Sequence, residues 1–485
     1  MSVAGLLLPF VVALPPGAVA PPPGSLPQAA HVMVLDRQLG LVAVRLPRRG
    51  VAVFLRRLRS APGVRYVERD APIQLAANGA GCETLGQGAQ PDPGWRTAIH
   101  LSRRSAAGML IGIADSGVDD DRLAPRQAPF LFLGPGTRTR PQDAFGHGTA
   151  VGSILVANRP DIGVIGLVPD ATLLSARIVK PGPCSSKVLA QGLVAALGWL
   201  RREGAQIVNV SATAPPSRAL VDSLRALELS GSLVVAAVGN GGKIAGRDLF
   251  PASKTGVLGV GALAPSSSTQ VWPGSTSGPQ VDLVAPASGI KVLSVKPTSE
   301  FVYTPSGTSF AAPLVTAAAA MVWATHRNWN AAEVANALVR SATPLPRGRA
   351  PSRSWGSGRL NVSLALRTAR MPDPHEPNDW GAAAQEQRPL RPGVVVVASL
   401  GYAGDAVDAY PIVVPAGTQA RARLRRGAQG VTMRVLPFRA SDAAITAVAG
   451  ESPRGAQVAL SPGRHLLVVA RSQGAGPYTL TLTRA

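Results

Sequence analysis

Residues 111–118 read Ile-Gly-Ile-Ala-Asp-Ser-Gly-Val and decide the fold class of the chain. A short apolar run ends at Asp115, and a turn at Gly117 follows it. Such a run is typical of a strand buried on both faces of a parallel sheet. Residues 233–238 form a second run of this kind and lead to Asn240. Because open α/β sheets carry their sites at the carboxyl ends of the strands, we expect both polar side chains at one sheet edge.

His147 and Ser309 each open a segment that has the composition of a buried helix. Gly146 and Gly148 flank His147, and an apolar pattern follows. Ser309 begins a run of small and apolar residues that ends at Thr325. The run resembles a membrane span in composition, but it is short and starts at a polar motif, so we predict a core helix and no transmembrane segment. The Ser309 hydroxyl would then lie at a helix N-terminus, where developing negative charge is favoured.

These four side chains provide the parts of an acyl-transfer site. A serine hydroxyl needs a base to take its proton during attack, and an imidazole has a suitable pKa. A carboxylate holds the imidazole in one tautomer, and an amide can donate to the oxyanion. We assign these roles, in that order, to Ser309, His147, Asp115 and Asn240. Each motif alone is common in turns and helix starts, so the assignment depends on all four occurring together in suitable contexts.

The motifs Asp115-Ser-Gly, His147-Gly-Thr and Gly307-Thr-Ser-Phe-Ala-Ala-Pro313 resemble the three signatures of subtilisin-like serine proteases, the subtilases, in that family's order. The resemblance implies an α/β domain with a mostly parallel central sheet. It also implies an endopeptidase that cuts protein and peptide substrates through an acyl-enzyme on Ser309, with no cofactor needed for catalysis. Structural calcium is common in the family, but this chain is poor in Asp and Glu, so we name no ligands.

The segment that resembles the family's substrate-pairing strand departs from the usual pattern. Residues 207–214 read Ile-Val-Asn-Val-Ser-Ala-Thr-Ala, where the family usually ends in Ser-Leu-Gly-Gly. The extra Cβ atoms should narrow the approach of a substrate backbone. A second departure is Ala150, where the family usually has another His. The resemblance places Asn240 in the oxyanion hole and implies substrate contacts at Ser211, Ala212, Thr213 and Gly239.

The first twenty residues resemble a secretory signal. Residues 4–14 are apolar, and Ala18-Val-Ala20 is a small-residue cleavage pattern, so residues 1–20 predict a signal peptide and a secreted protein. The pattern is imperfect, because the first basic residue is Arg37 and Pro21 follows the proposed cut. Either the true start lies upstream or cleavage falls elsewhere. The alternative is a disordered Pro-rich tail.

Residues 31–75 predict a small α+β unit of strand, turn, strand, helix and strand. Before a protease domain, this unit resembles the subtilase propeptide. The resemblance implies that it assists folding and acts as an intramolecular inhibitor until it is removed. The alternative is an unrelated small domain. Residues 76–93 are rich in Gly and Ala and predict the linker in which maturation occurs.

We predict the catalytic domain over residues 94–370, a Pro-rich hinge over 371–378 and a β-sandwich over 379–485. The last part shows short apolar runs separated by turn residues. Its motifs Asp408-Ala-Tyr410 and Gly476-Pro-Tyr-Thr-Leu480 resemble the bacterial pre-peptidase C-terminal domain, which accompanies secreted proteases. Asp405 and Asp408 could bind calcium, but we favour a role in the turns at strand ends.

The chain is strongly basic, with a formal net charge of +22. Such a charge can indicate a nucleic-acid or anionic partner. Because the chain has no nucleic-acid-binding motif and few aromatic residues, we favour an Arg bias spread over solvated surfaces and expect no nucleic-acid partner. Cys82 and Cys184 are the only cysteines, and either one disulfide or two inert thiols fits them.

Two other functions are compatible with parts of this pattern. A serine esterase usually presents Gly-x-Ser-x-Gly with its acid and base after the nucleophile. Here Ser309 follows both partners, and Ala311 occupies the position of the last Gly. An inactive protease-fold protein that serves binding or adhesion is the other alternative, and the intact set of four residues argues against it. Oligomeric state cannot be predicted from the sequence.

Overall fold

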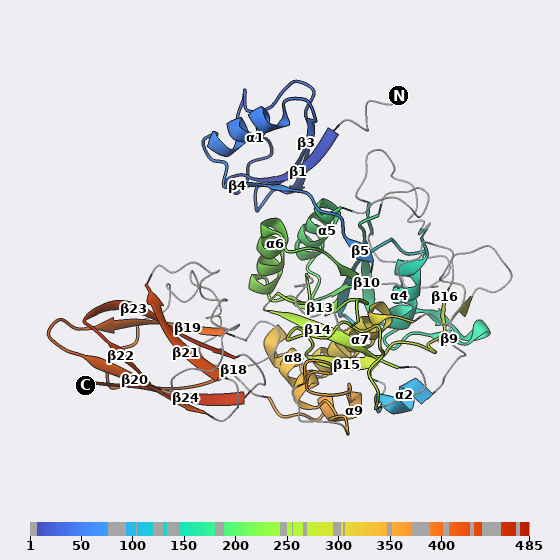
Figure 1. Ribbon diagram of the computed structural model, residues 1–485. Helices are drawn as coiled ribbons and strands as arrows, with labels where there is room; N and C mark the ends of the chain where they lie inside the picture. The colour runs from blue at the N-terminus through green and yellow to red at the C-terminus, as the bar shows by residue number, and fades with distance from the viewer. Residues whose placement is uncertain are drawn as a thin grey trace.

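The chain forms three parts in a computed structural model (Figure 1). The structure describes residues 7–75, 94–102, 104–119, 130–132, 143, 145–179, 189–242, 250–254, 256–264, 269–293, 302–303, 306–346, 352–370, 389–400, 407–426, 431–438, 457–471 and 476–484. The predicted linker, the predicted hinge, Cys82 and Cys184 lie outside these residues.

The central part is built on a seven-stranded sheet in the order β15-β14-β13-β11-β6-β10-β7. All neighbouring strands in this sheet pair in parallel, which confirms the predicted fold class. The strands are β6 (Leu110–Asp115), β7 (Phe130–Phe132), β10 (Thr172–Arg177), β11 (Ile207–Val210), β13 (Leu233–Ala237), β14 (Val257–Leu263) and β15 (Leu283–Pro286). The apolar runs before Asp115 and Asn240 are therefore buried strands, as the sequence predicts.

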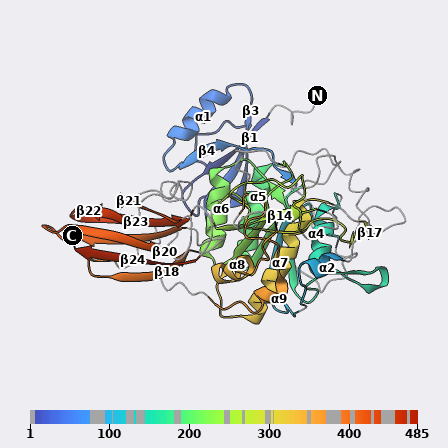
Figure 2. The same cartoon turned by 60° about the horizontal axis from the view of Figure 1, so that its bottom comes forward.

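Helices cover both faces of this sheet (Figures 1 and 2). They are α4 (His147–Val156), α5 (Ala190–Arg202), α6 (Arg218–Leu229), α7 (Thr308–Thr325) and α8 (Ala331–Arg340). Alternate residues of each strand contribute to opposite cores, because successive side chains of a strand point to opposite faces. Ile207 belongs to the core with α4, α7 and α8, whereas Val208 belongs to the core with α5 and α6.

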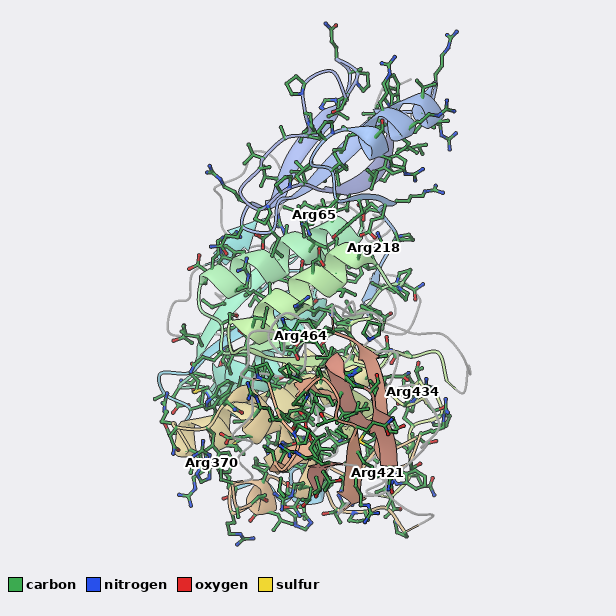
Figure 3. The ribbon with its side chains drawn as sticks, turned by 90° about the vertical axis from the view of Figure 1, so that its left-hand side faces the viewer. Arg65, Arg218, Arg370, Arg421, Arg434 and Arg464 are labelled. Carbon is green, nitrogen blue, oxygen red and sulfur yellow. The ribbon has the colours of Figure 1, made fainter. Side chains whose placement is uncertain are left out.

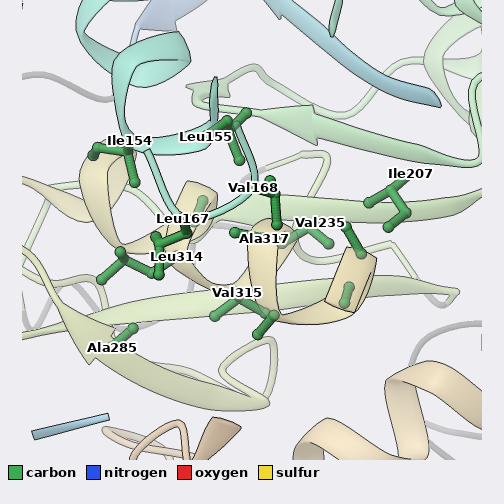
Figure 4. Close-up of a cluster of buried hydrophobic side chains, with 14 of the residues drawn as sticks. Ile154, Leu155, Leu167, Val168, Ile207, Val235, Ala285, Leu314, Val315 and Ala317 are labelled. Carbon is green, nitrogen blue, oxygen red and sulfur yellow. The ribbon is translucent and has the colours of Figure 1, made fainter. Parts of the chain in front are cut away.

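Helix α7 runs through the centre of the first core and has no solvent-facing side along most of its length. Figure 4 shows Leu314, Val315 and Ala317 of α7 in one buried cluster with Ile207 and Val235 of the sheet. Alanines occupy residues 317–320, and their small side chains let the neighbouring strands and helices approach closely. Among the described residues, α7 is the one helix long and apolar enough to cross a membrane, and 89% of its apolar window is buried inside the protein.

Shorter elements complete the central part. These are β5 (Gln74–Leu75), β8 (Asn158–Arg159), β9 (Val164–Ile165), β12 (Ala212–Thr213), β16 (Val292–Leu293), β17 (Val302–Tyr303), α2 (Gly94–Ala98), α9 (Val362–Ala365) and the 3-10 turn Pro160–Ile162. The pair formed by β5 and β12 joins the N-terminal part to the central part, because β5 comes from the chain before residue 76.

The N-terminal part is an antiparallel sheet in the order β2-β3-β1-β4 with one helix. Its elements are β1 (Leu7–Ala13), β2 (His31–Asp36), β3 (Leu41–Pro47), α1 (Val51–Ser60) and β4 (Tyr66–Arg69). The strands and helix predicted over residues 31–75 are all present. The structure adds β1, which lies between β3 and β4.

Strand β1 lies within residues 1–20, which the sequence analysis predicts as a signal peptide. The apolar run pairs along its whole length with β3 instead of forming a separate segment. It is apolar throughout because both of its faces are buried. Phe10 and Val12 pack on the side of α1, and Val11 and Ala13 pack on the side of α5 and α6. A continuous apolar run of this length fits either a signal core or a doubly buried strand, and its pairing partners decide the outcome.

The C-terminal part is formed by two antiparallel sheets, β18-β24-β20-β22 and β19-β23-β21. The described residues of this part hold seven strands. They are β18 (Val395–Leu400), β19 (Val407–Val414), β20 (Ala420–Arg426), β21 (Val431–Pro437), β22 (Gln457–Leu460), β23 (Gly463–Arg471) and β24 (Gly476–Arg484). Their inward residues form one core between the sheets.

Asp408 lies inside this core. It is fully buried, and its carboxylate accepts hydrogen bonds from the hydroxyls of Tyr478 and Tyr410. Hydroxyl donors satisfy an anionic oxygen but do not complete a calcium shell, which requires several oxygen acceptors. The sequence analysis favours a turn at a strand end for Asp408, but the side chain belongs to strand β19 and binds two tyrosines of the core. Asp405 lies outside the described residues.

Candidate active site

Asp115 and His147 meet at the carboxyl edge of the central sheet. Asp115 is the last residue of β6, and His147 is the first residue of α4. Asp115 Oδ1 lies 2.7 Å from Nδ1 of His147, and both side chains are buried. Because a carboxylate can only accept, Nδ1 carries the proton and Nε2 presents a lone pair. Among the described residues, Nε2 has no hydrogen-bond partner.

The surroundings of His147 favour its protonated form. Burial lowers the pKa of an imidazole, but the negative charge of Asp115 and its hydrogen bond outweigh this effect. The negative charge of Asp143 also raises the pKa of His147, so this pKa lies above its usual value. An imidazole in this state accepts a proton readily, which is the property that a general base needs.

Ser309 is the second residue of α7, and the residue after it lies near the base. The ring of Phe310, the next residue, is 5.7 Å from the ring of His147, measured between centroids. Ser309 Oγ lies 3.4 Å from the carbonyl oxygen of Ser211, and the Ser211 hydroxyl donates to the carbonyl oxygen of Ser309 over 2.9 Å. Gly307 before the helix has φ of 148°, a conformation that L side chains rarely adopt. The segment after β11 therefore fixes the first turn of α7.

Asn240 is held against the same turn of α7. Its Oδ1 accepts hydrogen bonds from the backbone N–H of Thr308 over 3.0 Å and from the Thr308 hydroxyl over 2.8 Å. Because a backbone N–H only donates, the amide oxygen must face Thr308, and Nδ2 lies on the other side of the amide group. Asn240 follows β13 after Gly239, whose φ is 95°. The side chain is therefore oriented by the residue that precedes Ser309.

The predicted substrate-pairing segment does pair with an extended chain. Ala212 of β12 pairs with Leu75, and Thr213 pairs with Gln74, in antiparallel orientation. On the other side, Pro72 forms an antiparallel bridge with Leu189. Residues 72–75 thus lie as a strand between two segments of the central part, next to the residue that contacts Ser309.

The structure shows three contacts among the site residues that the sequence analysis singles out and their direct neighbours. Asp115 and His147 are hydrogen-bonded, Ser211 contacts Ser309, and Asn240 contacts Thr308. The remaining members, Ala212, Thr213 and Gly239, lie on β12 and at the end of β13, within one or two residues of these contacts.

Sequence reasoning missed Asp143, a buried carboxylate that binds the loop before α4. The one available signal is its place four residues before His147. Among the described residues, no group of three or more His, Cys, Asp or Glu side chains is arranged to hold a metal ion.

Comparisons with known proteins identify the family. Residues 106–358, just over half of the chain, match the model of the subtilase family, peptidase S8. The alkaline protease of Alkalihalobacillus alcalophilus is 31% identical over 310 residues, which cover 63% of this chain and 75% of that protein. Subtilisin Savinase of Lederbergia lenta is 32% identical over 274 residues, or 56% of this chain and 95% of that protein.

A solved structure shares the fold across nearly the whole chain. Fervidolysin from Fervidobacterium pennivorans, a keratinolytic enzyme related to subtilisin, superposes with a TM-score of 0.63 at 15% identity. The superposition covers 94% of this chain and 85% of fervidolysin. With the fold, the meeting of acid and base and the family match in agreement, the chain belongs to the subtilases and is a serine-type endopeptidase.

Proposed function

We propose that this subtilase is a secreted endopeptidase made as a zymogen, with Ser309 as nucleophile, His147 as base, Asp115 as acid and Asn240 as oxyanion donor. The observation that carries the proposal is the buried hydrogen bond between Asp115 and His147, directly beside the first turn of α7. Few other arrangements would place an uncompensated imidazole nitrogen next to a serine at a helix N-terminus.

The geometry supports a two-step acyl transfer. Ser309 Oγ forms a bond to the substrate carbonyl carbon while its proton passes to Nε2 of His147, which requires the hydroxyl to rotate from the Ser211 carbonyl toward the imidazole. The oxyanion accepts from Asn240 Nδ2 and from the backbone N–H of Ser309, at the positive end of α7. His147 then gives its proton to the leaving amine, and water releases the acyl group by the same steps in reverse order.

The zymogen part of the proposal rests on how the N-terminal part meets the catalytic part. Its tail, residues 72–75, occupies the segment where a substrate strand would pair, so substrate and tail compete for β12. Removal of the tail is required before a substrate can bind there. The sequence predicts that this cut falls in residues 76–93.

Two carboxylates of the N-terminal part bind the starts of catalytic helices. Glu68 accepts from the backbone N–H groups of Arg218 and Ala219 at the start of α6 over 2.9 and 3.0 Å. Asp70 Oδ1 accepts from the N–H of Gln191 at the start of α5 over 3.0 Å. Helix N-termini present unsatisfied donors and a positive dipole end, so both contacts stabilise docking.

Side chains around Tyr66 extend this contact. The Tyr66 hydroxyl donates to Asp222 of α6 over 2.7 Å, and the guanidinium groups of Arg65 and Arg218 each lie 5.7 Å from the Tyr66 ring centre. Figure 3 shows Arg65 and Arg218 on the two sides of the junction, between the N-terminal part and the catalytic helices.

A third contact is a buried ion pair. Arg201 of α5 donates to Asp36 over 2.9 Å, and Asp36 packs against Gly198, where a Cβ atom would lie 2.4 Å from Oδ2. Only a glycine in this helix admits the Asp36 carboxylate at that distance. The fit indicates that the N-terminal part is a dedicated partner of this catalytic domain.

Secretion of the enzyme completes the proposal. A self-inhibiting N-terminal part suits a protease that must not attack the machinery that exports it.

The labelled arginines in Figure 3 come from all three parts of the chain rather than from one stripe, which supports a general Arg bias over a nucleic-acid site. Any structural calcium stays a prediction without named ligands.

Casein digestion by the purified chain and by Ser309→Ala tests the function. We expect cleavage by the parent and none above background by the variant, which should also keep its N-terminal part attached, as judged by intact mass. Ser341→Ala is the matched control, because Ser341 is equally buried but caps α8 away from the site.

Each alternative gives a different result in this assay. Hydrolysis of simple esters without cleavage of casein would favour the esterase. Equal results for the parent and Ser309→Ala would reject the catalytic assignment and favour an inactive binding protein.

A further inference from the structure

We propose that Asp143 is a positioning residue of this active site, which ties the strand end that carries Asp115 to the helix that begins with His147. The proposal rests on the function proposed above and adds a second buried carboxylate to the site. Asp143 does not contact the imidazole through a hydrogen bond. It acts through the two chain segments that hold the acid and the base.

The Asp143 carboxylate is buried and fully engaged. Its Oδ1 accepts from the Ser116 hydroxyl over 2.8 Å, from Phe145 N–H over 3.1 Å and from Gly146 N–H over 2.8 Å. Its Oδ2 accepts from both the N–H and the hydroxyl of Thr149 over 2.8 Å. These five donors come from the residue after Asp115 and from both sides of His147, so one carboxylate connects the two segments.

The two segments are also linked in the opposite direction. The Ser116 hydroxyl accepts from Gly148 N–H over 2.8 Å, and the Thr149 hydroxyl accepts from Asp119 N–H over 2.9 Å. A Cβ atom on Gly148 would lie 2.0 Å from the carbonyl oxygen of Gly117, so the segments approach as closely as backbone atoms allow. The distance between acid and base is therefore set by a connected network around Asp143.

The network admits a carboxylate and no close substitute. Both oxygens receive backbone N–H donors, which cannot accept a hydrogen bond. An asparagine would therefore turn its NH₂ group toward at least one N–H, and a buried donor would lose its partner. Replacing Asp143 by an amide removes the charge and also disturbs the loop.

The charge of Asp143 has an effect of its own. Asp143 raises the pKa of His147 in addition to the larger effect of Asp115. Among the described residues, the charge of Asp143 also acts on Arg177, the last residue of β10, whose own pKa is lowered by burial. Burial raises the pKa of Asp143 itself, and the donors from Thr149, Ser116 and Gly146 counteract this. A positioning carboxylate should therefore affect both the turnover number and its pH dependence.

The test compares Asp143→Asn and Asp143→Ala with the parent, using a chromogenic peptide substrate. We expect kcat to fall about tenfold to a hundredfold, since small displacements of catalytic groups have effects of this size. KM should stay within about twofold, because the network does not contact the substrate strand. The acid limb of the kcat/KM profile should move to lower pH, because His147 loses a neighbouring negative charge.

Asp408→Asn in the C-terminal sandwich is the matched control. It removes another buried, hydrogen-bonded carboxylate and should leave kcat and the pH profile unchanged. If the Asp143 variants do not fold, Ser116→Ala decides the matter, because it removes one link between the segments and keeps the carboxylate. We expect it to lower kcat severalfold without a change in KM.

The outcomes separate this proposal from the proposed function. Folded Asp143 variants with the parent's kcat and pH profile would overturn the positioning role, and so would an unchanged kcat in Ser116→Ala if the Asp143 variants do not fold. A parent no more active than Ser309→Ala would instead overturn the proposed function.

Discussion

A small number of directed contacts holds the His147 side chain in place. Its Nδ1 faces Asp115, its ring packs near Phe310, and the residues on either side of it bind Asp143. Each contact removes a way for the imidazole to move. An imidazole that is fixed in one tautomer and orientation does not have to reorganise when it accepts the proton. Such preorganised groups accelerate acyl transfer.

Asp115→Asn should lower kcat by about 10⁴-fold, the magnitude found when the acid of a serine-protease triad is changed to an amide. The amide can place its NH₂ against Nδ1 and stabilise the wrong tautomer. We propose to measure kcat on a peptide substrate at several pH values. Asp161→Asn, which breaks an exposed ion pair with Arg159, should be neutral and serves as control. A loss below tenfold would contradict the assigned role of Asp115.

The pH dependence of the parent follows from the raised pKa of His147. The base works only when it is neutral, so activity is present above the pKa of His147 and is lost as the pH falls through it. Because the pKa is raised, this loss should begin at a higher pH than for an ordinary imidazole, near 6.5. The kcat/KM profile measures it directly, and an acid limb well below pH 6.5 would show that burial outweighs the effect of Asp115.

The four candidate side chains could be chosen from the sequence because each stands in a distinctive local pattern. Asp143 could not, because three of its five donors are backbone N–H groups, which no sequence pattern displays. Its role becomes visible only when the loop before α4 is seen to fold back on residues 116–119.

Among the secondary-structure elements, β1 and α7 show what an apolar run can and cannot predict. Both runs are continuous, so neither has the periodicity that separates a strand from a helix. The length of the α7 run and its start at a polar motif identify a buried helix correctly. The β1 run has seven residues and fits a signal core equally well, and the pairing of β1 with β3 and β4 lies outside what one segment can reveal.

The small residues of α7 should be intolerant of enlargement. Ala318 has no exposed surface, so Ala318→Leu would overfill a close-packed core and destabilise the catalytic domain by about 1–3 kcal/mol. Urea unfolding of the variant in a Ser309→Ala background measures this without self-digestion. Arg340→Leu adds the same side chain at an exposed position of α8 and should change the midpoint little. Equal midpoints for the two variants would show that the core around α7 is not tightly packed.

Across the whole molecule, the N-terminal part is joined to the catalytic part through one face of its sheet, two carboxylates at helix starts and the strand β5. The order of the three parts along the chain was predictable from composition and motifs. Their contacts were not, because an interface is made of residues that are distant in sequence and individually ordinary, such as Asp36 and Gly198.

Docking of the N-terminal part should weaken as the pH rises. Burial raises the pKa of Asp70 from 3.8 to about 6 at the junction. The docked state then holds a proton more firmly than the free state. The favourable contribution of this proton is fully present below about pH 4 and is lost as the pH rises through about 6. A difference of roughly two pKa units corresponds to about a hundredfold in the docking equilibrium.

The rate at which the cut N-terminal part leaves the catalytic part, followed by the return of peptidase activity between pH 4 and 8, measures this effect. Asp70→Asn is the matched variant, because its amide oxygen still accepts from Gln191 but cannot titrate. The parent should release faster with rising pH, and the variant should show a much flatter dependence. The same slope for both proteins would exclude Asp70 as the responsive group.

The pairing of β5 with β12 indicates which proteins this enzyme would cleave. A substrate that pairs with β12 as β5 does would use main-chain groups, so it must offer a stretch of residues whose own amides are unoccupied. We therefore expect unfolded or damaged chains to be cut faster than compact proteins, whose amides are already hydrogen-bonded within helices and sheets. The enzyme would thus distinguish its substrates first by their conformation and only then by their side chains.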